Sequence, residues 1–195
     1  LAAAVPRTFG IKVIDVKTAF LNAHLPEQFE AIYLRPPQAL VDFGLVPPGT
    51  VWRAQKAIYG LRVSPRAWGL ERDRELGKMV IKHKGRDYRF VQSHVDPSVW
   101  SSLPVSGSDA VKAAGTAAIG WIVVYVDDFA IISDDPVIDL VRDVIAQKWR
   151  ITDKPTVSFG SGRTVEYLSV EIRAISDGFS CPRRPTPRTS SRSGP

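Results

Sequence analysis

The stretch GWIVVYVDDFAIISDD, residues 120–135, decides the fold that we expect for this chain of 195 residues. It contains two runs rich in β-branched and aromatic residues, 120–126 and 129–133, with the adjacent acids Asp127 and Asp128 between them. This pattern predicts a β-hairpin with both acids at its tip. Because an ionised carboxylate in apolar surroundings is costly unless it is paired or binds a cation, the tip either lies in water or holds a metal ion.

The rest of the sequence predicts further strands and two helices around this hairpin. Helical spacing of apolar residues starts at Ser64, which we expect to cap a helix with Pro65 at its first position, and occurs again over 136–149. Apolar runs bounded by Pro, Gly or polar residues predict strands at 10–16, 32–34, 51–57 and 164–176, and a further strand that ends in DPSVW (96–100). Segment 82–90 is polar and predicts a connection. Segment 102–118 is small and polar enough to be a mobile hairpin tip or an insertion. The fold class is therefore α+β, with helices packed on one face of an antiparallel sheet.

Charge and composition divide the chain into a body and a tail. The net charge is +6, and residues 182–195 hold four of the arginines and no acids. This Arg-, Pro- and Ser-rich end has no apolar periodicity, so we expect a disordered tail over residues 180–195. With 44% hydrophobic residues and no internal linker, residues 1–179 are expected to form one domain around a single core.

The sequence also argues against several classes of protein. Its longest apolar run, 119–126, is too short to span a bilayer, and the first ten residues lack the pattern of a signal peptide. We therefore expect an intracellular protein that is not secreted and has no membrane partner. A single cysteine, Cys181, excludes an internal disulfide and a cysteine-based zinc site. The three histidines show no metal-ligand spacing.

Six segments occur in an order and at a spacing that point to one family. They are IDVKTAFLNAHLPE (14–27), IYLRPP (32–37), KAIYGLRVSPRAW (56–68), DPSVW (96–100), WIVVYVDDFAIIS (121–133) and YLSVEI (167–172). Together they resemble the successive motifs of copia-type retrotransposon reverse transcriptases, which are RNA-directed DNA polymerases. The resemblance covers nearly everything from Ile11 to Ile172, and it is specific because YVDD occurs together with DVKTAFL and YGL..SPRAW.

The resemblance implies a polymerase palm that uses two Mg²⁺ ions, with Mn²⁺ as an alternative. Asp15 and Asp127 are implied to bridge the ions, with Asp128 supporting the same site and the backbone of Val16 beside it. Two such ions about 3.5–4 Å apart stabilise both the attacking and the leaving oxygen of an in-line phosphoryl displacement. The implied reaction is the transfer of dNTPs to the 3′-hydroxyl of a primer.

The resemblance also assigns residues to the nucleotide and to the nucleic acid. Phe20 falls where the family places an aromatic ring under the sugar, a position that excludes a 2′-hydroxyl, and Gly60 falls in the segment that approaches the nascent base pair. The residues implied to contact nucleic acid are Arg62, Ser64, Arg66, Tyr125, Tyr167, Leu168 and Ser169. Taken without the resemblance, Phe20 is better explained as a core aromatic. Tyr125 could as easily fill the sheet, and the arginines could equally be solvated.

The chain departs from the family pattern in ways that limit the expected activity. The family usually has a glycine where this chain has Ser169. Only fourteen residues precede Asp15, where the family has a fingers region, and the resemblance ends near Ile175, before a thumb and a ribonuclease H domain. We therefore expect a palm-like sheet with fingers and thumb largely missing, and weak or no polymerisation by the isolated chain.

Partners and alternatives follow from the same resemblance. The implied partners are an RNA template, a DNA primer, dNTPs and the integrase and ribonuclease H domains of a polyprotein, in a cytoplasmic virus-like particle or the nucleus. One alternative is a non-catalytic retroelement remnant that binds nucleic acid by charge. A nucleotide cyclase or another two-metal palm enzyme is disfavoured, because YGL..SPRAW has no place in it.

Overall fold

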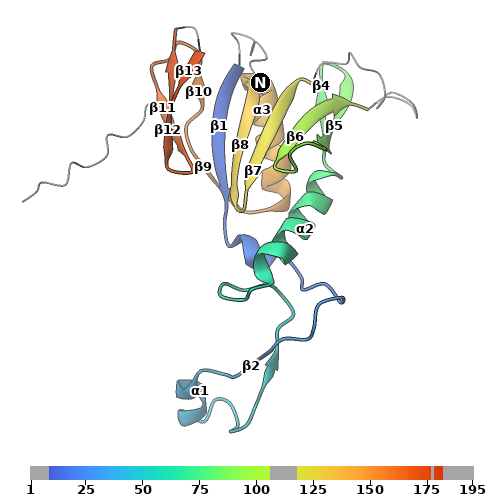
Figure 1. The fold of residues 1–195 in the computed structure, drawn as a ribbon, viewed down its shortest axis with the longest axis vertical. Coiled ribbons are helices and arrows are strands. Elements are labelled where there is room, and N and C mark those ends of the chain that lie inside the picture. The colour runs from blue at the N-terminus through green and yellow to red at the C-terminus, as the bar shows by residue number, and fades with distance from the viewer. Residues whose placement is uncertain (1–8, 106–117, 177, 182–195) are drawn as a thin grey trace, which may run out of the picture.

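The computed structural model describes residues 9–105, 118–176 and 178–181. Figure 1 shows a large sheet with a smaller sheet beside its β1 edge, helices against the large sheet, and an arm that extends away from it. The helices are the 3₁₀ helix η1 (Ala19–Asn22), α1 (Gln38–Asp42), α2 (Ser64–Leu76) and α3 (Asp135–Lys148). The strands are β1 (Phe9–Val16), β2 (Tyr33–Leu34), β3 (Trp52–Arg53), β4 (Val80–His83), β5 (Arg86–Gln92), β6 (Val99–Pro104), β7 (Gly120–Tyr125), β8 (Asp128–Asp134), β9 (Ile151–Asp153), β10 (Val157–Ser158), β11 (Thr164–Tyr167), β12 (Val170–Ile175) and β13 (Gly178–Ser180).

The large sheet is antiparallel, and β8 and β7 lie in its middle between β1 and β6. Its strand order is β10-β1-β8-β7-β6-β5-β4, with β9 also paired to β1. Strands β7 and β8 form the hairpin predicted from residues 120–135, and the register sets Tyr125 opposite Asp128. The strand predicted at 10–16 is β1, and the two predicted helices are α2 and α3.

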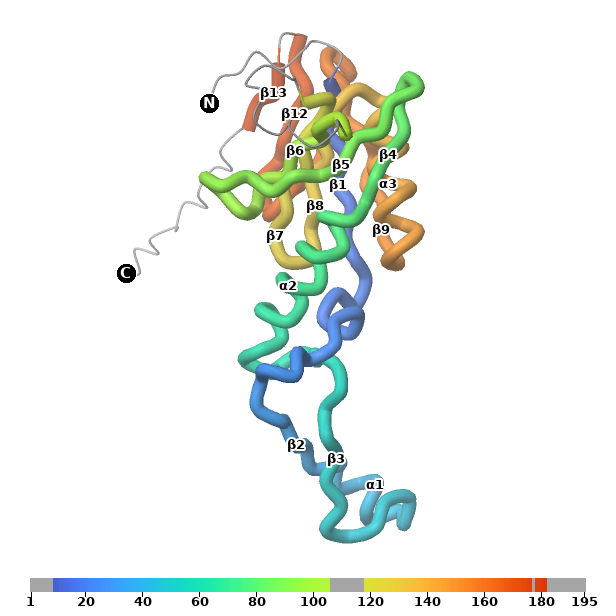
Figure 2. Tube along the Cα trace, turned by 90° about the vertical axis from the view of Figure 1, so that its right-hand side faces the viewer, coloured from blue at the N-terminus to red at the C-terminus, as the bar shows by residue number. Residues whose placement is uncertain are grey.

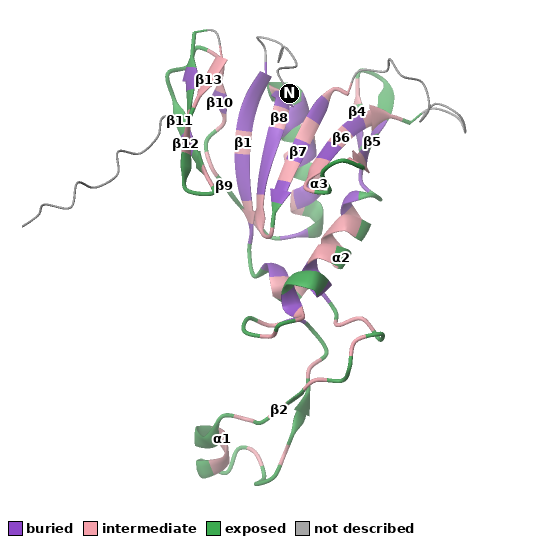
Figure 3. Ribbon diagram, in the orientation of Figure 1, coloured by how far each residue is buried: buried purple, intermediate pink, exposed green. Residues whose placement is uncertain are grey.

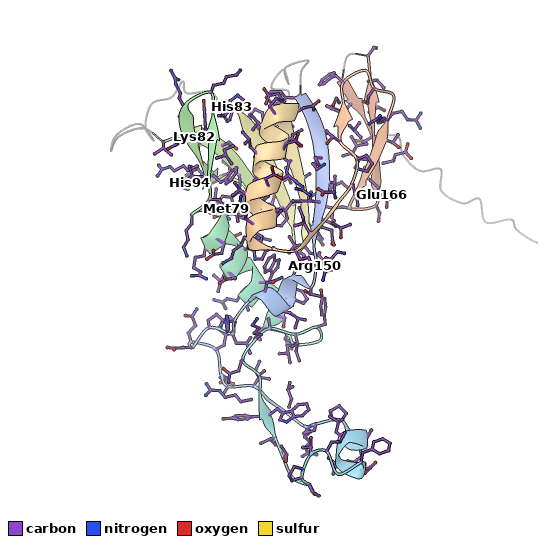
Figure 4. All side chains as sticks on the ribbon, turned by 180° about the vertical axis from the view of Figure 1, so that it is seen from behind. Met79, Lys82, His83, His94, Arg150 and Glu166 are labelled. Carbon is purple, nitrogen blue, oxygen red and sulfur yellow. The ribbon has the colours of Figure 1, made fainter. Side chains whose placement is uncertain are left out.

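The two faces of this sheet are covered by different elements. On one face, Ile14 and Val16 of β1 pack with buried residues of α2 and α3, among them Trp68 and Ile145, and Figure 4 shows α3 lying over the back of the sheet. On the other face, Val13 packs with Val165 and Ala174 of the small sheet β11-β12-β13. The alternation of side chains along a strand explains why neighbours such as Val13 and Ile14 belong to different clusters. The α+β class with helices on one face is thus confirmed in outline.

The arm contains β2, α1 and β3. Figure 2 shows it extending below the sheet, and Figure 3 shows that its residues are mostly exposed or half-buried. Helix α1 has no buried residue, and Phe43 just after it is 81% exposed. The strand predicted at 32–34 is present in part as β2 (Tyr33–Leu34). Of the strand predicted at 51–57, Trp52–Arg53 form β3 and Lys56 makes an isolated bridge to His24. The arm therefore adds little to the core of the described domain.

Three local predictions were wrong. Residues 82–90, predicted as a connection, lie largely in the β4–β5 hairpin, which turns at Lys84 and Gly85 with φ of 47° and 73°. Residues 164–176, predicted as one strand, form the β11–β12 hairpin. Ser64 does not cap α2, because Val63 is the N-cap residue and the Ser64 hydroxyl donates to the Ile58 carbonyl at 2.6 Å.

Several other predictions fall partly outside the described residues. Most of the predicted insertion at 102–118 and the tail from residue 182 onward are not described, while Ser180 belongs to β13. In the described part of the chain, no helix is long and apolar enough to cross a membrane.

Candidate active site

The β1–β8 register brings the predicted acids together. Asp15, near the carboxyl end of β1, is the direct antiparallel partner of Asp128, the first residue of β8. Directly opposed residues point to the same face, with Cβ atoms about 4.5–5.5 Å apart. Asp127 precedes Asp128 in the turn, and all three acids are half-buried. Because Asp15 alternates with Ile14 and Val16, this face is the one turned away from α2 and α3.

The electrostatics of Asp128 show that the three acids influence one another. Burial raises the pKa of Asp128, and the negative charges of Asp127 and Asp15 raise it further, whereas the positive charge of Lys154 lowers it. Ionisation of Asp128 is therefore disfavoured when no cation is bound. A divalent cation would favour the ionised form, so the site has the charge that a metal centre needs.

The backbone of the tip is held from two sides. The indole N–H of Trp68 in α2 donates to the Val126 carbonyl at 2.7 Å. The Val16 amide of β1 donates to the Asp127 carbonyl at 2.9 Å. The Val16 backbone, which was predicted to lie beside the ions, thus joins β1 to Asp127. Trp68 was predicted only as part of the apolar side of its helix.

A groove separates the tip from the β11–β12 hairpin. It has a volume of about 620 Å³. Its lining residues are Tyr125, Asp128, Lys154, Glu166, Leu168 and Ser169. The structure therefore gathers three of the residues assigned to nucleic acid, Tyr125, Leu168 and Ser169, next to an acid of the tip. Tyr125 is 60% exposed, so it does not fill the sheet.

Sequence reasoning missed Lys154 and Glu166 in this groove. The Lys154 ammonium donates to the backbone carbonyl of Glu166 at 3.0 Å, and Figure 4 places Glu166 on the small sheet. Lys154 thereby connects that sheet to the surroundings of Asp128. No local pattern marks either residue, because a single lysine between an aspartate and a proline has no motif of its own.

The β11–β12 hairpin is attached to the large sheet through Tyr167. Its hydroxyl donates to the Val123 carbonyl of β7 at 3.3 Å, and burial, followed by the charge of Asp128, raises its pKa to about 12. The turn residues Leu168 and Ser169 have φ of 50° and 63°. Ser169 therefore occupies a left-handed conformation that glycine adopts without strain, which gives a physical meaning to its departure from the family pattern.

A second group of predicted residues gathers around η1 and the start of α2. The half-buried ring of Phe20 lies 4.8 Å from the ring of Tyr59, centroid to centroid. Gly60 follows with φ of 94° and is exposed, a conformation that favours glycine.

The polar residues assigned beside that turn differ in their accessibility. Arg62 and Arg66 are both exposed, and the Arg66 guanidinium lies 5.6 Å from the centroid of the Phe29 ring. Ser64 is fully buried and bonded to the Ile58 carbonyl, so its side chain is not accessible to nucleic acid in this conformation.

Comparison with known proteins identifies the family. The profile described as reverse transcriptase (RNA-dependent DNA polymerase) matches residues 1–182. The chain belongs to the reverse transcriptase family. It is 28% identical over 185 residues to the retrovirus-related Pol polyprotein from transposon RE2 of Arabidopsis thaliana, and 26% identical to that from transposon RE1. Each comparison covers 94% of this chain and 10% of the relative, so the chain spans about one tenth of these polyproteins.

The donors at the tip of this reverse transcriptase chain suit magnesium by their chemistry. Asp15, Asp127 and Asp128 offer only carboxylate oxygens, which Mg²⁺ prefers. As the side chains stand in the described residues, no three His, Cys, Asp or Glu groups converge to hold a metal ion. The histidines offer no competing centre there, and Figure 4 shows His83 on the far edge of the sheet from Glu166. The assignment of the three acids to the ions stays a prediction, which the chemistry of their oxygens supports.

Proposed function

We propose that this chain is the palm of a retrotransposon reverse transcriptase and that it adds deoxynucleotides to the 3′-hydroxyl of a primer paired with an RNA template. The observation that carries the proposal is the pairing of Asp15 with Asp128 beside Asp127, on a half-buried face next to an open groove. Family membership supports the reaction class, and the arrangement of the acids supports two-metal chemistry.

The acids act by holding the metal ions, and the ions neutralise negative charge on the substrate. Asp15 and Asp127 would bridge two Mg²⁺ or Mn²⁺ ions, Asp128 would complete the site, and the Val16 backbone would keep β1 aligned with the tip. When bound, the ions lower the pKa of the primer hydroxyl and neutralise charge on the triphosphate and the leaving pyrophosphate. The protein then contributes mainly a fixed position for each oxygen.

Phe20 and its neighbours would form the nucleotide side of the site. Phe20 is backed by Tyr59, so its ring is supported rather than free to move away from an extra hydroxyl. Gly60 presents exposed backbone without a side chain, and the exposed Arg62 and Arg66 offer charge to phosphates. We expect Phe20→Ala to admit ribonucleotides, and unchanged sugar selectivity would remove this role.

The groove would receive the primer end. Tyr125 offers an exposed ring beside the acids, and Leu168 and Ser169 form the opposite wall. Because the relatives are about ten times longer than this chain, template grip, integrase and ribonuclease H functions are assigned to other parts of a polyprotein. The isolated chain is therefore expected to be weakly active or inactive.

Two measurements test the proposal together. Mn²⁺ binding to the purified chain and primer extension by the full-length polyprotein enzyme should both be lost in Asp127→Asn and Asp15→Asn. Asp139→Asn is the matched control, because it removes the same charge from the exposed side of α3. Retention of both properties in Asp127→Asn would reject the metal-ligand assignment. Binding of nucleic acid that is independent of both acids, without extension, would instead support a non-catalytic remnant.

A further inference from the structure

We propose that Trp68 is a positioning residue that holds the turn bearing Asp127 and Asp128 through its hydrogen bond to the Val126 carbonyl. The meaning of this role for catalysis rests on the proposed function, but the role itself is a property of the folded chain. It assigns a task to the tryptophan of SPRAW, which lies 58 residues from the turn in sequence.

The turn needs to be held because its backbone is strained. Only Val126 and Asp127 separate β7 from β8. Val126 has φ of 49°, in the left-handed region that a β-branched residue rarely adopts. Strained backbone persists only where surrounding contacts impose it. The contacts on Val126 are therefore part of what fixes the direction of the two acids that follow it.

Trp68 is the best placed of the groups that contact the Val126 carbonyl. Its indole N–H lies 2.7 Å from that oxygen, whereas Arg72 Nη1 lies at 3.5 Å. The guanidinium of Arg72 is also engaged by Asp73, with Nη2 2.8 Å from a carboxylate oxygen. The shorter and more buried bond is the stronger constraint.

The Trp68 side chain is itself fixed in place. It is 1% exposed, and its ring packs edge-on against Trp149 at 5.2 Å between centroids. Trp149 in turn contacts Phe129 of β8 at 6.2 Å, one residue beyond Asp128. The donor therefore cannot turn away without repacking the core, and helix α2 and the acidic tip are held at a fixed distance from each other.

The arrangement also links the two halves of the site. Trp68 belongs to the first turns of α2, the helix that follows the Gly60 turn in the chain and also carries Arg66. Its hydrogen bond ends on the turn that carries the acids. A displacement of the start of α2 would therefore be transmitted directly to Asp127 and Asp128.

Hydrogen exchange of the Val16 amide gives a direct measurement, because this amide is bonded to the Asp127 carbonyl. Trp68→Phe keeps a buried ring and removes the donor, so exchange at Val16 should become roughly tenfold faster relative to amides in the middle of β8. Trp149→Phe is the control, because it changes the neighbouring ring without removing the donor to the Val126 carbonyl. The affinity for Mn²⁺ should likewise fall more in Trp68→Phe than in Trp149→Phe.

A double-mutant cycle tests whether Trp68 acts by holding the strained backbone of Val126 or only by filling space in the core. Val126→Gly removes the strain, so Trp68→Phe should have a clearly smaller effect on Val16 exchange in that background. If Trp68→Phe does not fold alone, the proposal requires that it folds together with Val126→Gly.

Equal effects in both backgrounds, equal effects of Trp68→Phe and Trp149→Phe, or failure of the double variant to fold would overturn the proposal. Because exchange is measured without metal or nucleic acid, its outcome is independent of whether the chain polymerises DNA.

Discussion

Two glycines in this chain predict opposite responses to the same substitution. Gly120 starts β7 opposite Ser133 of β8. A Cβ added at Gly120 would lie 2.8 Å from Ser133 Cβ, 2.9 Å from its Oγ and 3.1 Å from the Ile132 carbonyl. Gly69 lies inside α2, and an added Cβ there meets nothing within 4 Å. Gly120→Ala should therefore destabilise the fold, whereas Gly69→Ala should stabilise it.

The expected magnitudes follow from these contacts. Overpacking a well-packed position costs about 1–3 kcal/mol. Alanine in place of glycine within a helix gains about 1 kcal/mol. Since 1 kcal/mol shifts Tm by about 2–4 °C in a domain of this size, Gly120→Ala should lower Tm by about 2–12 °C, and Gly69→Ala should raise it by about 2–4 °C. Thermal unfolding followed by circular dichroism at one pH and ionic strength measures both.

A second substitution tests the cause of the Gly120 effect. Ser133→Gly removes two of the three contacting atoms, so the double variant should lose less stability than the two single variants added together. The Ser133 hydroxyl also donates to the Ile119 carbonyl, so Ser133→Gly alone has its own cost. Additive losses, or a Gly120→Ala variant as stable as the parent, would refute the steric reasoning.

Three further predictions concern the site. Ser169→Gly should raise Tm by roughly 1–3 °C, because the relief of the left-handed φ of 63° outweighs the added chain entropy; a lower Tm contradicts this. The pKa of Asp128 is raised in the folded chain, so ionisation of Asp128 lowers the stability of the fold as the pH rises above the unfolded pKa near 4. Asp128→Asn should therefore be more stable than the parent at pH 7 without divalent ions. This difference in stability should vanish near pH 3. Thermal melts across this pH range check it, and a constant difference would show another cause. Lys154→Met should raise the pKa of Asp128 further, since it removes the charge that lowers it; a carboxyl NMR titration that shows no upward shift would contradict this.

Local sequence was sufficient for the central elements. The β7–β8 hairpin, β1, α2 and α3 all lie where the periodicity of apolar residues predicts them, because each contributes one apolar face to the core. The β4–β5 hairpin was missed because β5 alternates exposed polar residues with only a few buried ones near the sheet edge. The β11–β12 turn was missed because Leu168 and Ser169 are not the residues that usually occupy a left-handed turn.

The candidate site, like the fold, could be predicted only in part from the sequence. The sequence by itself determined the residue types: three acids, a family pattern around them, and the expectation that Asp127 and Asp128 end a hairpin. Only the tertiary structure decided that Asp15 stands opposite Asp128, that Trp68 holds Val126, and that Lys154 joins the small sheet to the groove. Periodicity reports on neighbours within one element, whereas these contacts depend on strand register and on the packing of segments far apart in the chain.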